Sequence, residues 1–200
     1  MGRHREFDVE KVLDAVLCVF WRKGYEGASY ADLTAAAGVE RPALYSAFGN
    51  KEALFRKALD RYNERFLGYM PAALKLPTSR EAAGHILHGA IDLNTRYAEH
   101  TGCLVINGVL AGSDEAEPVR QCLIEARATA EQQLRERFER AKVEGDLSEN
   151  AKPAALAAFL MAVLHGMAVQ AKAGFSREAL EAVAEQALST WPDEKAKHRA

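Results

Sequence analysis

The sequence predicts an all-α fold, with an N-terminal three-helix bundle that contains a helix-turn-helix and a larger helical C-terminal domain. Apolar residues recur at spacings of three and four along most of the chain, which is the period of a helix. Glycines and prolines separate these stretches, and no strand-like alternation of useful length occurs. With 200 residues, of which 48% are hydrophobic, the chain is long enough to bury a substantial core.

The first predicted helix lies before Gly24 and is amphipathic. Its apolar residues form one stripe at helical spacing, which is typical of a helix that packs on its neighbours. The stripe consists of Val9, Val12, Leu13, Val16, Leu17, Phe20 and Trp21. This helix is therefore expected to brace the elements that follow it.

Residues 28–55 predict two short helices joined by a tight turn, with a third helix after them. Ser29 and Asp32 have the spacing of a capping box at the start of the first short helix. Gly38 stands where a helix ends in a left-handed residue. The region therefore has the layout of a helix-turn-helix.

The second short helix is predicted at about Arg41–Phe48. Pro42 fits its first turn, and Leu44 and Phe48 are an inward-facing pair. Glu40 is predicted to cap its start. A third helix of about residues 51–70 then links the module to the rest of the chain.

The order of these residues resembles the TetR family of bacterial transcriptional repressors over roughly residues 8 to 57. The residues that carry the resemblance are Gly24, Tyr25, Ser29, Ala36 to Val39, Leu44, Tyr45, Phe48, Lys51, Glu52, Leu54 and Phe55. It implies a DNA-binding domain at residues 1–57 and a ligand-binding and dimerisation domain at residues 58–200. The implied function is a repressor that binds a palindromic double-stranded operator as a dimer and is released by a small molecule.

The resemblance also implies which residues contact DNA. The major groove is assigned to Arg41, Pro42, Ala43, Tyr45 and Ser46, and the DNA backbone to Ser29, Tyr30 and Lys51. Base contacts would give specificity, and phosphate contacts would give register and salt-dependent affinity. The alternative for Lys51 is an ordinary solvated cation at the start of a helix.

The second region is predicted to be helical throughout. Helices are expected from Thr78 or Ser79 to about residue 100, at about 117–143, at 154–172 and after Ser176. The 154–172 helix has too many apolar positions for one buried stripe, so the last two helices are predicted to form a four-helix bundle with a second copy. The apolar run 154–169 is shorter than a membrane span, and no membrane association is expected.

The candidate inducer pocket is built from polar residues scattered among apolar ones in this second region. The predicted lining is His88, Asp92, Tyr97, Cys103, Asn107, Arg127, Phe159 and His165. A ligand site needs a few such polar groups among apolar walls. The alternative for each is a satisfied buried polar residue or a surface residue.

Cys103 suggests a different kind of signal. It stands at the start of a short apolar segment, in a stretch similar to TetR-type regulators that sense electrophiles or oxidants through a cysteine. A helix N-terminus favours the thiolate. The opposing interpretation is a small, buried apolar residue, which is how free cysteine usually behaves.

Other function classes lack support in the sequence. The chain contains no GxSxG, HExxH, P-loop or GxGxxG motif, so an enzyme is not expected. His85 and His88 have no third ligand at metal spacing, and no metal or cofactor is expected. The three cysteines and the absence of a signal-peptide core favour the cytoplasm. A helical scaffold or adaptor that retains the module without reading DNA stays open, because the net charge is only -2.

Overall fold

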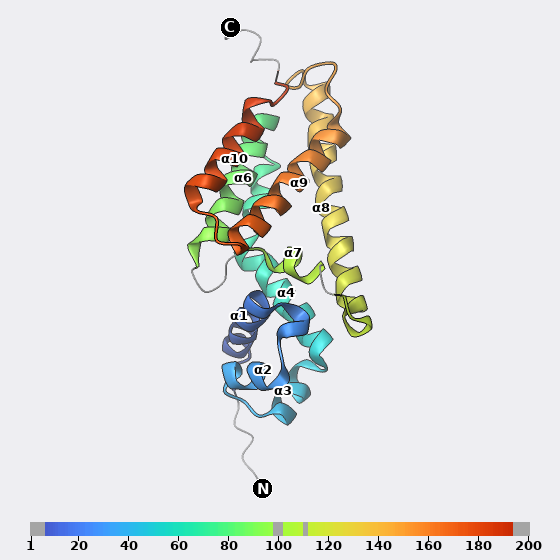
Figure 1. Cartoon of the computed structure of the whole chain (residues 1–200). Coiled ribbons are helices and arrows are strands. Elements are labelled where there is room, and N and C mark those ends of the chain that lie inside the picture. The colour runs from blue at the N-terminus through green and yellow to red at the C-terminus, as the bar shows by residue number, and fades with distance from the viewer. Residues whose placement is uncertain (1–6, 98–101, 110–111, 194–200) are drawn as a thin grey trace.

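The computed structural model describes residues 7–97, 102–109 and 112–193, and within these ranges the fold is all-α, as predicted. The helices α1, α2 and α3 lie together at one end of the molecule, and α6, α8, α9 and α10 lie at the other (Figure 1). Helices α4 and α7 lie between the two groups. The elements are α1 (Val9–Gly27), α2 (Tyr30–Ala37), α3 (Arg41–Phe48), α4 (Lys51–Phe66), α5 (Tyr69–Ala73), α6 (Ser79–Arg96), α7 (Leu104–Val109), η1 (Asp114–Ala116), α8 (Glu117–Val143), α9 (Pro153–Lys172) and α10 (Arg177–Ser189).

The start of α2 carries the predicted capping box. The Asp32 backbone N–H donates to Ser29 Oγ at 3.1 Å, and the Ser29 N–H donates to the Asp32 carboxylate at 3.1 Å. Lys23 Nζ adds a 2.6 Å ion pair to the same carboxylate. The hydrogen bonds to Lys23 and Ser29 hold the pKa of Asp32 far below its usual value. Gly38 ends α2 at φ +64°, in the left-handed region predicted for it.

The prediction that Glu40 caps α3 is wrong. Glu40 occupies the N-cap position, but its side chain makes no capping hydrogen bond. The short side chains of Ser, Thr, Asp and Asn suit this position. Glutamate is one methylene longer and is not among the residues that cap well, and α3, which has Pro42 in its first turn, starts without a side-chain cap.

The three N-terminal helices and α4 share an aromatic core. Trp21 packs edge-on against Tyr62 with ring centroids 4.9 Å apart, and Phe20 packs edge-on against Phe55 at 5.1 Å. Tyr25 also contacts Phe55, at 5.4 Å. All of these side chains are buried. Because α1 and α4 meet through large rings, their relative orientation is closely constrained.

The same core continues beyond α4. Leu104, Val119 and Leu123, on α7 and α8, belong to the hydrophobic cluster that includes α1–α4. The Trp21 indole N–H donates to the Gly102 carbonyl oxygen at 2.8 Å in a buried contact. The domain boundary at residue 57 therefore stays a prediction, since apolar packing crosses it.

Helix α4 is shorter than the predicted 51–70, and a separate short helix follows it. Helix α4 ends at Phe66, and α5 begins at Tyr69 and contains Pro71. The break falls next to Gly68, a residue with low helix propensity. Proline is compatible with the first turn of α5 because the N–H groups there have no intrahelical partner.

A second hydrophobic core joins α6, α8, α9 and α10. Phe138 and Trp191 lie edge-on at 5.3 Å, and the Trp191 indole N–H donates to Ser79 Oγ at 3.2 Å. Thr78 forms a capping box with Glu81 at the start of α6. The predicted helices at 117–143 and 154–172 are confirmed as α8 and α9.

The prediction of no membrane span was based on the apolar run 154–169, and helix α9 is longer than that run. Its 20 residues have a mean hydropathy of 1.8 in the most apolar window, so its length and composition alone allow a membrane span. Leu160, Leu164 and Met167 are buried against the neighbouring helices. This packing accounts for one side of its apolar surface, while Phe159 and Val169 remain 43% and 50% exposed.

Candidate functional site

The outward surface of α3 carries a compact group of aromatic and cationic side chains. The Arg41 guanidinium lies 4.1 Å from the centroid of the Tyr30 ring, and Arg41 Nη2 donates to Tyr45 Oη at 3.1 Å. The Tyr30 and Tyr45 rings lie 5.2 Å apart. A hydrogen bond with Tyr30 and the guanidinium of Arg41 lower the pKa of Tyr45. The group joins α2 to α3 on the solvent side.

All of the predicted DNA-contacting side chains lie at accessible or partly accessible positions. Ser29, Arg41, Pro42 and Ser46 are exposed, whereas Tyr30, Ala43, Tyr45 and Lys51 are half-buried. The predicted inward pair, Leu44 and Phe48, is buried. One face of α3 is thus anchored in the core and the other is open to a partner.

Lys51 begins α4 beside the aromatic core. Its ammonium lies 4.7 Å from the centroid of the Tyr25 ring, and burial lowers the pKa of Lys51, opposed by the nearby carboxylates of Glu115 and Glu26. Ser29 Oγ already donates to Asp32 at 2.7 Å. A phosphate contact by Ser29 would therefore have to compete with its role in the cap, whereas the Lys51 ammonium has no hydrogen bond or ion pair within the described part of the chain.

Two further links hold the N-terminal module to the second region. The Glu26 carboxylate accepts hydrogen bonds from the backbone N–H groups of Gly112 and Ser113, at 3.1 and 2.8 Å. Lys172 Nζ, on α9, donates to the Arg22 carbonyl oxygen at 3.1 Å. Together with the Trp21 bond to Gly102, these contacts tie α1 to the segments before and after α7 and to the end of α9.

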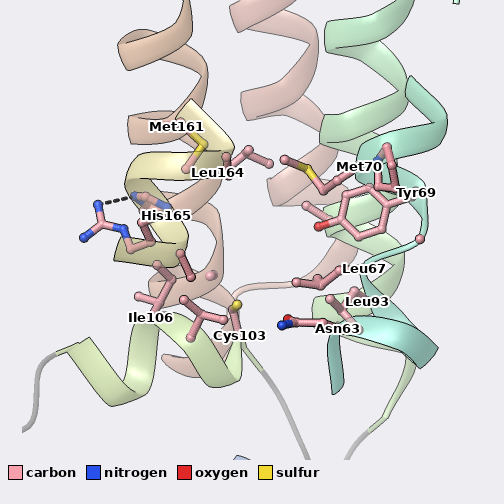
Figure 2. Close-up of a pocket in the computed structure, with 18 of the residues that line it drawn as sticks. Asn63, Leu67, Tyr69, Met70, Leu93, Cys103, Ile106, Met161, Leu164 and His165 are labelled. Atoms are coloured by element: carbon pink, nitrogen blue, oxygen red, sulfur yellow. Dashed lines mark hydrogen bonds between the residues drawn. The ribbon is translucent and has the colours of Figure 1, made fainter. Parts of the chain in front are cut away.

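A cavity of about 510 Å³ lies in the second region, bounded by α4, α5, α6, α7, α8 and α9. Figure 2 shows Met161 and His165 on one side and Met70 and Tyr69 on the other. Most of the wall is apolar, but the residues lining it also include Asn63, Asn94, Cys103, Arg127 and His165. An apolar cavity with a few polar groups suits a small organic molecule.

Arg127 and His165 form a polar pair on the cavity wall. Arg127 Nη2 and His165 Nδ1 lie 3.0 Å apart (dashed line, Figure 2). Burial and the positive charge of Arg127 lower the pKa of His165 to about 4. The imidazole is therefore neutral at pH 7, and Nδ1 accepts the hydrogen bond from the guanidinium.

Cys103 lies at the floor of the cavity directly before α7. The buried Tyr62 hydroxyl donates to Cys103 Sγ at 3.5 Å, and burial raises the pKa of Tyr62 well above its usual value. The thiol is partly accessible rather than buried. It faces the cavity from the same segment whose Gly102 carbonyl is bonded to Trp21.

Known proteins match the chain over nearly its whole length. Residues 12–58 match the family described as bacterial regulatory proteins, tetR family, and residues 84–187 match the tetracyclin repressor-like C-terminal domain. The chain belongs to the TetR family.

Relatives of this TetR-family chain include both curated proteins and solved structures. The HTH-type transcriptional repressor ComR of Escherichia coli is 32% identical over 194 residues, covering 96% of this chain and 92% of ComR. A cysteine mutant of the TetR family regulator CifR, in complex with 26-bp operator DNA, is 41% identical with a TM-score of 0.90, covering 95% of this chain and 100% of that one. A TetR regulator from Rhodococcus sp. RHA1 is 38% identical with a TM-score of 0.63, covering 93% and 100%. The protein is thus a TetR-family transcriptional repressor, and its relatives are regulators rather than enzymes.

Cys103, Arg127 and His165 are the residues of the predicted lining that reach the cavity of this TetR chain. The others lie elsewhere because of helical register. On α6 the face that carries Ala90, Leu93 and Asn94 lines the cavity, so His88 and Asp92 point away from it. On α9 the lining begins at Met161, and Phe159 is exposed on the outer face; Asn107 is on α7 but does not line the cavity.

Two of the displaced residues have other partners. Asp92 forms a 2.5 Å ion pair with Arg177 of α10. Tyr97 packs against Trp21 and Phe66, with ring centroids 5.9 Å away in each case. Both Asp92 and Tyr97 line a separate hollow of about 160 Å³. They belong to the packing between α6 and its neighbours.

Several residues that line the cavity were not predicted from the sequence. Tyr69 and Met70 were missed because α5 was not predicted. Asn94 had a readable signal, since it falls on the buried face of α6 with Leu87, Ala90 and Ile91. A polar side chain on an otherwise apolar helical face indicates a specific partner or a site. Over the described ranges, no three His, Cys, Asp or Glu side chains are grouped to hold a metal.

Proposed function

We propose that the protein acts in the cytoplasm as a homodimer that binds a palindromic operator and is released by a small molecule held in the cavity. The observation that carries this proposal is the position of the cavity. Asn63 and Leu67, at the C-terminal end of α4, line it, while Lys51 begins the same helix beside α3. A ligand that displaces the C-terminal end of α4 would also move its N-terminal end beside α3, because α4 is one helix of 16 residues, roughly 24 Å long.

The contacts around α7 supply a second route from the cavity to the DNA-binding helices. Cys103 faces the cavity, and the adjacent Gly102 carbonyl accepts the buried hydrogen bond from Trp21 on α1. Rotation of α1 and α4 in each protomer changes the separation of the two α3 helices. Two reading helices must lie about one DNA turn, roughly 34 Å, apart to enter successive major grooves. A ligand that favours another separation lowers operator affinity.

The homodimer is proposed to form through the outer faces of α9 and α10. Phe159 and Val169 are large exposed apolar residues on α9, and Ala158, Ala162 and Gly166 are small residues on the same helix. Phe159 and Val163 line a shallow hollow with Val183 of α10. A two-fold axis would bring two such helix pairs together as a four-helix bundle.

The experiment measures operator binding with a labelled DNA fragment from upstream of the gene, in the presence of a library of small organic molecules. Some compounds are expected to release the wild-type protein. Ala126→Trp should resist them, because Ala126 is an exposed residue on the cavity wall and a large side chain there obstructs the ligand without disturbing the core. Equal binding to operator and random DNA would instead favour the adaptor.

Covalent sensing through Cys103 is a second candidate, favoured by the position of its thiol. Cys103 Sγ is accessible from the cavity and accepts a hydrogen bond from Tyr62. A mild alkylating agent should then modify Cys103 before Cys18 and Cys122 and abolish operator binding, and Cys103→Ser should remove the response. Release by reversible ligands with unchanged sensitivity in Cys103→Ser would leave the thiol a cavity-lining residue only.

A further inference from the structure

Arg127 lines the cavity beside His165, and its charged guanidinium has no acidic partner among the described residues. Its Nη2 contacts the His165 ring, and its Nε is buried without a hydrogen-bond partner. Three other arginines of α8, namely Arg120, Arg135 and Arg140, pair with carboxylates, and Arg137 donates to the Leu76 and Pro77 carbonyl oxygens. Arg137 also has buried donors without a partner, but among the arginines of α8, all of which the structure describes, Arg127 is the one that lines the cavity.

His165 cannot neutralise this charge. Its imidazole is neutral at pH 7, so it orients the guanidinium as an acceptor but contributes no negative charge. Glu64 also lines the cavity, but it forms no ion pair with Arg127 in the described part of the chain. The positive charge is thus available to a bound molecule.

The other side chains that line the cavity indicate that the uncharged body of a bound molecule is apolar. Met161, Leu164 and Ile106 lie on the His165 side, and Met70 and Leu67 lie opposite (Figure 2). These side chains would surround an apolar body. Burial of that body supplies most of the binding free energy, and a single charged group at one end fixes its orientation.

Two further polar groups on the cavity wall, the Tyr69 hydroxyl and the Asn94 amide, are uncharged. The Tyr69 hydroxyl points into the cavity (Figure 2), and burial raises the pKa of Tyr69 so that it remains a neutral donor. Asn94 is 2% exposed, and its Oδ1 has no hydrogen-bond partner among the residues that the structure describes. Both groups can bind a polar substituent but neither supplies a second charge.

We infer that the cavity binds an organic monocarboxylic acid with an apolar body, whose carboxylate pairs with Arg127. The guanidinium is suited to this because its fixed N–H groups match the two oxygens of a carboxylate. Pairing also satisfies the buried Nε, whose desolvation is otherwise uncompensated. The inference rests on the proposed ligand-responsive function and names the chemical class of its ligand.

The test uses calorimetric titration of the full-length protein with sodium octanoate and sodium 4-phenylbutyrate, and with octanamide as the neutral counterpart. Arg127→Gln removes the positive charge. Arg127→Lys keeps the charge but lacks the planar pair of N–H groups that matches a carboxylate. Arg135→Gln is the matched control, because Arg135 lies on the same helix and lines a different hollow. Thermal melts of all variants establish that each is folded.

The acids are expected to bind the wild type and Arg135→Gln equally, and to bind Arg127→Gln about tenfold to a hundredfold more weakly, from the usual strength of charge-assisted hydrogen bonds. Arg127→Lys should lie between. Octanamide should bind the wild type more weakly than octanoate and be insensitive to Arg127→Gln. Equal binding of acid and amide, equal binding by Arg127→Gln, or no binding of either acid would overturn the inference.

Operator-binding measurements separate this inference from the proposed function. If neutral compounds release the operator and the acids do not bind, ligand control stands and the carboxylate assignment falls. If the acids bind through Arg127 and operator affinity is unchanged, the carboxylate site stands and ligand control by this cavity falls.

Discussion

The helices before residue 67 and those after residue 78 satisfy their buried polar groups differently. Side chains cap helix starts in both regions, at α1, α2 and α4 and at α6 and α10, but large aromatic rings fill the core between α1 and α4. Among the described residues, the buried side-chain polar atoms without a partner lie only between Asn94 and Asp193. Two of these residues, Asn94 and Arg127, line the cavity. The first region is suited to holding one geometry, and the second retains unused binding capacity for a ligand.

The largest expected difference concerns core packing. Phe55→Ala, in the aromatic core, should lower the free energy of unfolding by about 3–5 kcal/mol, whereas Met161→Ala, on the cavity wall, should cost about 2 kcal/mol because it only enlarges an existing space. Denaturant unfolding followed by circular dichroism measures both. Equal losses would mean that the cavity wall is packed as tightly as the N-terminal core.

Substitution of Arg41 and of Arg127 tests whether DNA binding and ligand binding depend on different regions of the protein. Arg41→Ala should weaken operator binding about tenfold to a hundredfold at one base position, because Arg41 is exposed on the outer face of α3. Arg127→Gln should leave ligand-free operator affinity unchanged. Lys51→Ala should weaken all DNA sequences alike and lower the salt slope by about one.

Gel-shift titrations at several salt concentrations give both the sequence preference and the salt slope. Arg41→Ala losses that are the same for every DNA sequence would remove Arg41 from the base-reading set. A change in ligand-free operator affinity caused by Arg127→Gln would show that the cavity residue also maintains the DNA-binding geometry.

Removing a polar side chain should have opposite effects in the two regions. Ser29→Ala deletes the cap of α2 and should destabilise the protein by about 1 kcal/mol. Asn94→Leu replaces an amide whose buried oxygen has no partner, and should stabilise it by about 1 kcal/mol. Thermal melts without ligand measure both, and a loss of stability in Asn94→Leu would imply that the amide has a partner such as ordered water.

The last comparison concerns the pH dependence contributed by His165. Its pKa in the folded protein is about 4, below the ordinary value of 6.5, so between these values the unfolded chain binds a proton that the folded chain does not. Stability therefore falls as pH is lowered through this window. His165→Gln should reduce that fall relative to the wild type, and unfolding curves at pH 7 and pH 5 provide the comparison.

Much of the N-terminal module was predictable because its signals are local. The Ser29–Asp32 capping box, the left-handed Gly38 and the inward pair Leu44 and Phe48 each depend on residues a few positions apart, and all are found in the structure. Glu40 was mispredicted because capping depends on where the end of a long side chain lies. Pattern alone does not specify that position.

The candidate ligand site was less predictable because it depends on helix register and on contacts between distant segments. Cys103 directly before α7, Arg127 of α8 and His165 of α9 line the same cavity, whereas His88 of α6 and Phe159 of α9 lie outside it. A shift of one or two residues along a helix turns a side chain by roughly 100° or 200°, from the cavity to another face. No spacing rule within one helix reveals where a second helix leaves a gap.

The sequence by itself determined the all-α class, the helix-turn-helix and most helix boundaries, because periodicity, caps and glycine or proline breaks act within one or two turns. The tertiary structure alone decided the location of the cavity, the lack of an acidic partner for Arg127 among the described residues, and the Trp21 bond to Gly102. These features arise where segments far apart in the chain meet, and their energies depend on burial and on which partners remain within reach.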